Sequence, residues 1–330
     1  MTRILVVAPS WIGDTIIAQP LLSRLHEKHA DLELDVLAAR WSAPLLARMK
    51  EVREVIDSPF GHGELKLAER WQLGRQLKTR HYDEAIVLPN SLKSALIPFF
   101  AGIARRTGYT GESRYGLINN RHQLDTEKHP RLVDRYVELA DAPAATTLPR
   151  PQLQSSPEQQ RSARQALGLP LTGAPIVFCP GAEYGAAKRW PARHFAALAQ
   201  LVGRSDDPVW LVGSPKDAAV GEKIAQLSAG AAINLCGRTT LEQALDLIAA
   251  ARQVVCNDSG LMHVAAALAR PLVAVFGSSS FNYTPPISPL AQIVSLELEC
   301  SPCFRRECPL GHLNCLNELT PERVLSAMRH

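Results

Sequence analysis

The strongest constraint on the fold is an alternation of short apolar runs with helical stretches, repeated along the chain. Residues 4–8 and 84–88, for instance, are mostly apolar segments that end in loops. Such runs are typical of strands buried on both faces of a parallel sheet. Helical stretches between successive strands predict a doubly wound α/β sheet. In the first half, strands are expected at 4–8, 34–39, 52–56 and 84–88, and helices at 44–49 and 64–78.

The same alternation restarts in the second half, after a proline-rich segment at residues 141–156 that we interpret as an interdomain linker. A chain of 330 residues is too long for one ordinary core and suits two domains. We therefore predict two Rossmann-like domains, residues 1–155 and 156–330, facing a central cleft, with a last helix from Pro321 that can pack back on the first domain. Expected elements of the second half are a helix at 158–167 and strands at 176–179, 209–212, 232–235, 254–256 and 272–276.

Charge and composition exclude several classes of function. The net charge is only +4, and no Lys/Arg run is long enough to follow a nucleic-acid backbone, so a nucleic-acid partner is not expected. The first apolar run is cut short by Pro9, which makes it too short for a signal peptide or a membrane span. We expect a cytoplasmic protein whose seven cysteines are kept reduced.

An anion site is predicted where the apolar run 254–256 ends and a helix begins. Asp258 or Ser259 can cap that helix, because Asp and Ser oxygens accept backbone N–H groups of the first turn. The amides near Gly260 and Leu261 would then be free to bind a diphosphate without a metal ion. The alternative is an ordinary strand–turn–helix junction. His263, in the first turns, is either part of the site or a packing residue.

Two further strand ends of the second half carry polar side chains. Lys188 and Arg189 precede Pro191, which we expect to be the first residue of a helix. Cations at a helix N-terminus oppose the helix dipole, so they indicate a bound anion unless they are simply solvated. After the strand at 232–235, Thr239 and Glu242 fit a capping box, and Glu242 could instead accept hydrogen bonds from ribose hydroxyls.

The first half contributes polar loops, at residues 9–14 and 89–91, which follow strands and should face the cleft. Residues 93–135 include eight basic and only four acidic side chains. This excess is either a solvated face or a platform for an acidic acceptor. The chain has neither GxGxxG nor GxxxxGK[ST], so neither a dinucleotide fingerprint nor a P-loop is supported. The candidate acceptor-binding residues are Asn90, Lys93, Arg114 and Arg121.

Four cysteines near the C-terminus have the spacing C-x2-C-x4-C-x6-C. Four thiols can make a tetrahedral zinc site, but the spacing departs from two clean CxxC pairs. Reduced cysteines packed in a loop are the alternative. The four residues are Cys300, Cys303, Cys308 and Cys315.

Taken together, these motifs resemble those of the GT-B glycosyltransferases that add heptose to lipopolysaccharide. The resemblance covers nearly the whole chain. The Asp-Ser-Gly-x-x-His turn at 258–263 marks the broad family, whereas the Trp-Ile-Gly-Asp loop at 11–14 and the Cys-Ser-Pro-Cys segment favour the members that add the second heptose. Residues 88–91 and 106–109 also match those members.

The resemblance implies an inverting transferase that needs no cofactor and no metal. It implies that the C-terminal half holds ADP-L-glycero-β-D-manno-heptose and the N-terminal half holds heptosyl-Kdo2-lipid A, with possible peripheral contact with the inner membrane. Asp14 matches the general base, although Asp14 could instead cap a helix starting near Thr15. Asp258 is assigned to capping or to sugar hydroxyls, because a carboxylate would repel phosphates. The donor-binding residues would be Lys188, Glu242, Asp258, Ser259, Gly260, Leu261 and His263.

Three alternative functions stay open. The chain could add the first heptose, or a later one, because these enzymes share the fold and much of the site. It could also bind or hydrolyse a nucleotide-sugar without transferring it.

Overall fold

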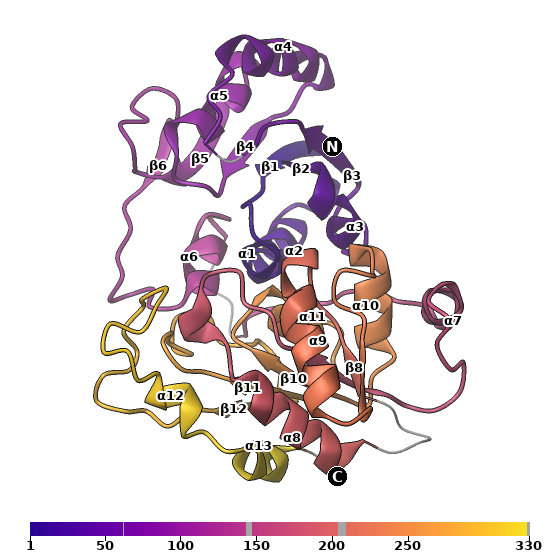
Figure 1. Ribbon diagram of the computed structural model, residues 1–330. Helices are drawn as coiled ribbons and strands as arrows, with labels where there is room; N and C mark the ends of the chain where they lie inside the picture. The colour runs from indigo at the N-terminus through magenta and orange to yellow at the C-terminus, as the bar shows by residue number, and fades with distance from the viewer. Residues whose placement is uncertain (62, 143–146, 204–208, 329–330) are drawn as a thin grey trace. The chain divides into compact units, whose positions relative to one another are not determined.

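The computed structural model describes residues 1–61, 63–142, 147–203 and 209–328. The chain divides into two compact units, Met1–Pro151 and Gln152–His330. Each unit is a parallel α/β sheet covered by helices, which confirms the predicted fold class (Figure 1). The predicted linker includes residues 143–146, which lie outside the described residues. Among the described residues, no helix is long and apolar enough to cross a membrane.

The first unit holds a six-stranded sheet in the order β3-β2-β1-β4-β5-β6, with every neighbouring pair parallel. Val6 of β1 faces Val36 of β2 and Ile86 of β4, so the centre of the sheet is apolar. The strands are β1 (Thr2–Val7), β2 (Leu32–Ala39), β3 (Glu54–Ser58), β4 (Glu84–Val87), β5 (Arg105–Tyr109) and β6 (Asn120–His122).

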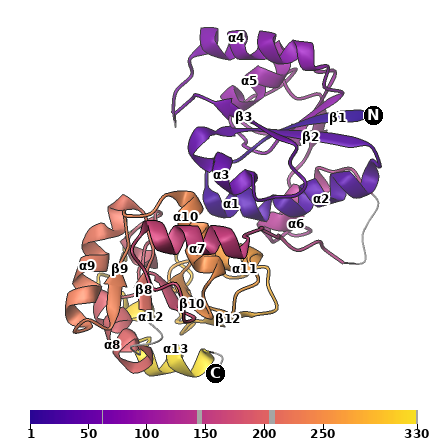
Figure 2. The ribbon, with the colours of Figure 1, turned by 90° about the vertical axis from the view of Figure 1, so that its right-hand side faces the viewer.

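Helices cover both faces of this sheet. Figure 2 shows α4 and α5 together on one face and α1, α2 and α6 on the other. Leu5 and Val7 pack into the core beneath α4 and α5, because successive strand residues point to opposite faces. The helices are α1 (Ile12–Ile17), α2 (Gln19–Lys28), α3 (Ala43–Leu46), α4 (Leu67–Leu77), α5 (Leu92–Phe100) and α6 (Leu132–Glu138), with short 3-10 turns at Arg40–Ser42 and Lys78–Arg80.

The second unit repeats the arrangement, with the strand order β12-β11-β10-β7-β8-β9 and parallel pairing throughout. Helix α13 packs on α8, β11 and β12 of the same unit. The strands are β7 (Ile176–Cys179), β8 (Val209–Leu211), β9 (Ala232–Asn234), β10 (Gln253–Asn257), β11 (Leu272–Val275) and β12 (Ala291–Val294). The helices are α7 (Pro157–Ala166), α8 (Ala192–Val202), α9 (Ala218–Leu227), α10 (Leu241–Ala249), α11 (Gly260–Ala267), α12 (Asn314–Asn317) and α13 (Pro321–Ala327), with 3-10 turns η3 (Ala186–Lys188) and η4 (Pro215–Asp217).

Both sheets have one point where the strand order reverses. In the first unit it lies between β1 and β4, and in the second between β7 and β10. Open α/β sheets bind ligands outside the carboxyl ends of the strands at such a switch point. The loops that follow these four strands are therefore the places to look for a site.

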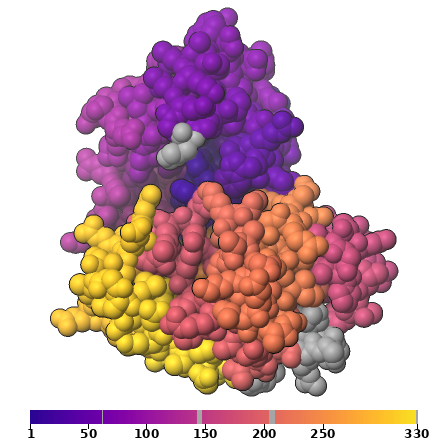
Figure 3. All heavy atoms as spheres, viewed as in Figure 1, coloured from indigo at the N-terminus to yellow at the C-terminus, as the bar shows by residue number. Residues whose placement is uncertain are grey.

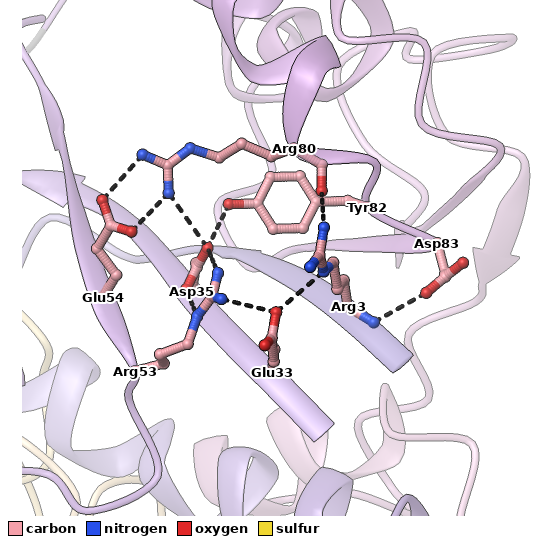
Figure 4. Close-up of polar contacts among 8 residues, drawn as sticks. All are labelled: Arg3, Glu33, Asp35, Arg53, Glu54, Arg80, Tyr82 and Asp83. Carbon is pink, nitrogen blue, oxygen red and sulfur yellow. Dashed lines mark hydrogen bonds and ion pairs between the residues drawn. The ribbon is translucent and has the colours of Figure 1, made fainter. Parts of the chain in front are cut away.

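An ion network around one buried carboxylate lies near the amino-terminal ends of β3 and β4, away from those loops. Figure 4 shows the Asp35 carboxylate of β2 between the side chains of Arg53, Arg80 and Tyr82. Asp35 Oδ2 lies 2.6 Å from Arg53 Nη2 and accepts a hydrogen bond of 2.5 Å from the Tyr82 hydroxyl. Burial and this hydrogen bond raise the pKa of Tyr82 above its usual value, so the phenol stays protonated. The network is structural, because it holds β2 to the starts of β3 and β4.

Candidate functional site

At the switch point of the second unit, the structure joins two of the predicted donor residues. Lys188 ends η3 in the loop after β7, and Asp258 directly follows β10. Lys188 Nζ lies 2.6 Å from Asp258 Oδ2, and the Lys188 and Asp258 side chains are only 18% and 6% exposed. The Ser279 hydroxyl also donates to Asp258 Oδ2. The result is a largely buried cation that is already held in place by a carboxylate.

The predicted role of Asp258 as the cap of α11 was wrong, whereas its predicted contact with sugar hydroxyls stays a prediction. The residue in the N-cap position of α11 is Ser259, and its side chain makes no capping hydrogen bond. The Oγ atoms of Ser259 and Ser278 are both buried and have no partner among the described residues. Buried hydroxyls are normally hydrogen-bonded, so the Ser259 hydroxyl at this uncapped helix start is consistent with a polar ligand there. Gly260 and Leu261 form the first turn of α11, as predicted.

Asn257, the last residue of β10, holds the loop after β7 in place at this switch point. Its Nδ2 donates to the Pro180 carbonyl at 2.7 Å, and its Oδ1 accepts from the Trp190 backbone N–H at 3.0 Å. The side chain is completely buried. Sequence analysis missed this residue, although an Asn at the end of an otherwise apolar strand was a signal that could have revealed it.

His263 is buried in α11, one turn beyond Ser259. Burial lowers its pKa to about 4, with Asp258 raising it and Lys188 lowering it by smaller amounts. The imidazole is therefore neutral at pH 7. It can exchange hydrogen bonds with a ligand or with its surroundings, but it supplies no positive charge.

Two expectations about the neighbouring loops, on the capping box and on Pro191, were wrong in detail. The capping box of α10 is formed by Thr240 and Gln243, one residue beyond the predicted pair, so Glu242 is an exposed side chain outside it. Pro191 is the N-cap of α8 rather than its first helical residue. The Arg189 guanidinium donates to the carbonyl of Ala182 and so fastens its own loop.

In the first unit, Asp14 lies in the helix that follows β1, one of the two strands at the switch point. Helix α1 begins at Ile12, and Trp11 is its N-cap. Asp14 is thus the third residue of the helix, and the predicted alternative of a cap for a helix starting near Thr15 was wrong. A carboxylate in the first turn still gains from the helix dipole. Its side chain is half-buried.

Arg114 and Asn90 are brought together, but Arg114 faces inward. It is only 3% exposed and donates to the Pro89 carbonyl at 2.8 Å, to Asn90 Oδ1 at 3.3 Å and to the Tyr109 carbonyl. Burial lowers its pKa. Arg114 therefore supports the loop after β4 and orients Asn90. Lys93 lies in the first turn of α5, close to the same loop.

A pocket of about 300 Å³ lies beyond β5. Arg121 is exposed at its edge, with its guanidinium 5.7 Å from the centre of the Tyr115 ring. Other basic side chains of this region serve the fold: Arg105 pairs with Glu84 and Asp141, and Arg131 pairs with Asp134. The pocket is lined by Tyr109, Thr110, Gly111, Glu112, Ser113, Arg114, Tyr115, Ile118 and Arg121.

Comparison with known proteins places these sites in a family. Residues 70–314 match the model of Glycosyltransferase family 9 (heptosyltransferase). The chain is 45% identical to lipopolysaccharide heptosyltransferase 2 of Escherichia coli (strain K12), over 99% of this chain and 97% of that protein. It is 44% identical to lipooligosaccharide heptosyltransferase 2 of Haemophilus influenzae, over 99% and 98%. The solved structure of E. coli ADP-heptose lps heptosyltransferase II superposes with a TM-score of 0.88 and 42% identity, covering 99% of this chain and 97% of that one. The two α/β sheets and this match confirm the predicted GT-B type.

Proposed function

The chain belongs to glycosyltransferase family 9, the heptosyltransferases, and from this membership we propose that it moves L-glycero-D-manno-heptose from ADP-heptose to the first heptose of the lipopolysaccharide inner core. The full-length similarity to heptosyltransferases of type 2 supports this choice of acceptor. The observation in the structure that best supports the donor is the buried Lys188–Asp258 pair beside the uncapped start of α11.

The second unit is the proposed donor domain. A diphosphate at the start of α11 would accept hydrogen bonds from the amides of the first turn, where the helix dipole favours negative charge. Lys188 is within the same switch point and would stabilise the charge that grows on the departing ADP. Ser259 offers a hydroxyl without a partner among the described residues. Glu242 and His263 remain proposed donor contacts, Glu242 for hydroxyl groups of the nucleotide-sugar.

The first unit is the proposed acceptor domain, with Asp14 as the general base. Its carboxylate would take the proton of the acceptor hydroxyl while that oxygen attacks the anomeric carbon from the side opposite ADP. The new glycosidic bond forms as the bond to the diphosphate oxygen breaks, which inverts the anomeric centre. Helix amides and Lys188 receive the leaving group, so the scheme requires no cofactor.

Acceptor binding is proposed for the loop after β4 and for the pocket beyond β5. Asn90 and Lys93 lie at the first, and Arg121 lies at the second, where a guanidinium suits the carboxylates of Kdo. Arg114 acts indirectly, by holding Asn90. Because the acceptor carries lipid A, we propose peripheral contact with the cytoplasmic face of the inner membrane.

A panel of acceptors tests the function directly. Labelled ADP-heptose is incubated with Kdo2-lipid A carrying zero, one or two heptoses, and with no acceptor. We expect label only on the acceptor that carries one heptose. Label on the heptose-free acceptor would instead identify a first-heptose transferase, and release of free heptose in every tube would identify a hydrolase.

Replacing Lys188 by Ala should weaken the use of ADP-heptose. The lost charge-assisted contact is expected to cost about 1.5 to 3 kcal/mol in kcat/KM, as for hydrogen bonds to charged groups. Steady-state kinetics with ADP-heptose as the varied substrate measure this loss. The matched control is Lys216→Ala, which removes an exposed lysine paired with Glu183 in the same unit and should leave kcat/KM unchanged. Equal kinetics in both variants would exclude Lys188 from the donor site.

A further inference from the structure

The four C-terminal cysteines are gathered around one small cavity, although they play no part in the proposed transfer reaction. The cavity has a volume of about 20 Å³. A volume of this size holds one water molecule or one ion. The surface of the second unit that Figure 3 shows includes the C-terminal segment, in yellow, to which these residues belong. The residues that line the cavity include Cys300, Cys303, Cys308, Cys315 and His312.

The backbone of the same segment already contacts one of these sulfur atoms. The Leu313 backbone N–H donates to Cys308 Sγ at 3.4 Å. Four thiols so close together repel one another once ionised, unless a cation lies between them.

His312, the imidazole of the lining, is less suited to a cation. His312 Nδ1 already accepts a hydrogen bond of 2.9 Å from the Asn314 backbone N–H. Within the residues that the structure describes, no three His, Cys, Asp or Glu side chains already form a metal-ligand set. Binding of an ion must therefore turn the thiols inward around the cavity.

We propose that Cys300, Cys303, Cys308 and Cys315 bind one thiophilic divalent cation, such as Zn²⁺, in a tetrahedral structural site. Each thiol that binds gives its proton to solvent, and no electron is transferred. Tetrathiolate sites of this kind contribute directly to folding, because the unfolded chain lacks the assembled ligand set.

The segment that carries the four cysteines also forms hydrogen bonds with the loops of the proposed donor site. A bound cation would therefore stabilise these loops as well. The Phe304 N–H donates to the Ser278 carbonyl at 2.7 Å, and the Ala187 N–H donates to the Arg306 carbonyl at 3.0 Å. Ala187 precedes Lys188, and Ser278 precedes Ser279, the partner of Asp258. A Cβ added at Gly185 would lie 2.3 Å from the Arg306 carbonyl oxygen, so the two loops touch backbone to backbone. A fixed cysteine segment therefore fixes the loop that carries Lys188.

Metal analysis of the full chain, purified under reducing conditions without a histidine tag, tests the proposal. Elemental analysis should find about one zinc or iron per chain, or about one zinc after incubation with Zn²⁺ and removal of the excess. Titration with an organomercurial, which captures thiolates, should release this metal while the thiols of the segment react. Thermal unfolding should occur at a lower temperature after release.

Two variants complete the test. Cys303→Ser combined with Cys308→Ser should lower the metal content to less than about a tenth of an ion per chain. Cys236→Ala removes a buried thiol outside the segment and should keep the full content. If the double variant does not fold, the organomercurial titration of the parent chain decides alone. A parent chain that stays below about a tenth of an ion per chain after incubation with Zn²⁺ would overturn the proposal, whatever its transferase activity.

Discussion

Replacement of Asp14 by Asn is expected to slow heptose transfer by roughly 10²- to 10⁴-fold, the usual contribution of a general base. Asn has nearly the shape of Asp but cannot take the proton of the acceptor hydroxyl. Donor binding should be unaffected, because the donor contacts proposed above lie in the second unit. Single-turnover transfer, ADP-heptose binding and thermal unfolding should all be measured on this one variant.

The position of Asp14 makes the control important. Asp14 is the third residue of α1, so its negative charge also interacts favourably with the helix dipole. This interaction contributes about 0.3–1 kcal/mol to stability. Glu69→Gln removes the charge of another first-turn acid, in α4 of the same unit, so it should reproduce the loss of stability without the loss of rate. If transfer by the Asp14→Asn variant stays within a few-fold of the parent, Asp14 is not the base.

Removal of the Asp35 carboxylate should have the largest effect on stability. Asp35→Ala leaves Arg53, Arg80 and the Tyr82 hydroxyl without their common partner. Loss of one member of a buried pair costs about 3–5 kcal/mol. We expect about 3 kcal/mol, the lower end, because the Arg53 side chain is 41% exposed and can be solvated. Urea unfolding of the parent and the variant measures the difference in the transition of the first unit.

Glu33→Ala provides the contrast for this prediction. Glu33 contacts Arg53 and Arg3 at 2.6 and 2.9 Å, but these pairs are much more exposed to solvent than Asp35 is. Exposed pairs contribute about 0–1 kcal/mol. If the Glu33 and Asp35 variants lose similar amounts of unfolding free energy, the burial of Asp35 does not determine how much the network contributes to stability.

The central strands could be predicted because burial on both faces leaves a continuous apolar run, as in residues 4–8. Three other strands could not. β5 begins with Arg105 and Arg106, although β4 and β6 flank it, and β6 is the polar triplet Asn120–His122 at the edge of the sheet. An edge strand has only one neighbouring strand, so its sequence need not be apolar. β12 is an edge strand of the second sheet, and two of its four residues are exposed.

The candidate sites were predictable to the level of the loop, not of the individual contact. Strand ends indicated the loops of Asp14, Lys188 and Asp258, since parallel strands bring their carboxyl ends to one edge. The ion pair between Lys188 and Asp258 joins residues 70 positions apart, which no local pattern encodes. The sequence also did not reveal that Arg114 supports the loop after β4, because a basic residue in a polar segment resembles a solvated one.

The two hydrogen bonds of Asn257 have a consequence for affinity. They join the loop after β7 to the end of β10 within the folded unit, so these segments are ordered by contacts that belong to the fold. A ligand that docks there does not have to restrict their motion, and the conformational entropy of the loops is lost during folding instead of during binding. More of the contact energy between the site and a nucleotide-sugar then remains as net affinity.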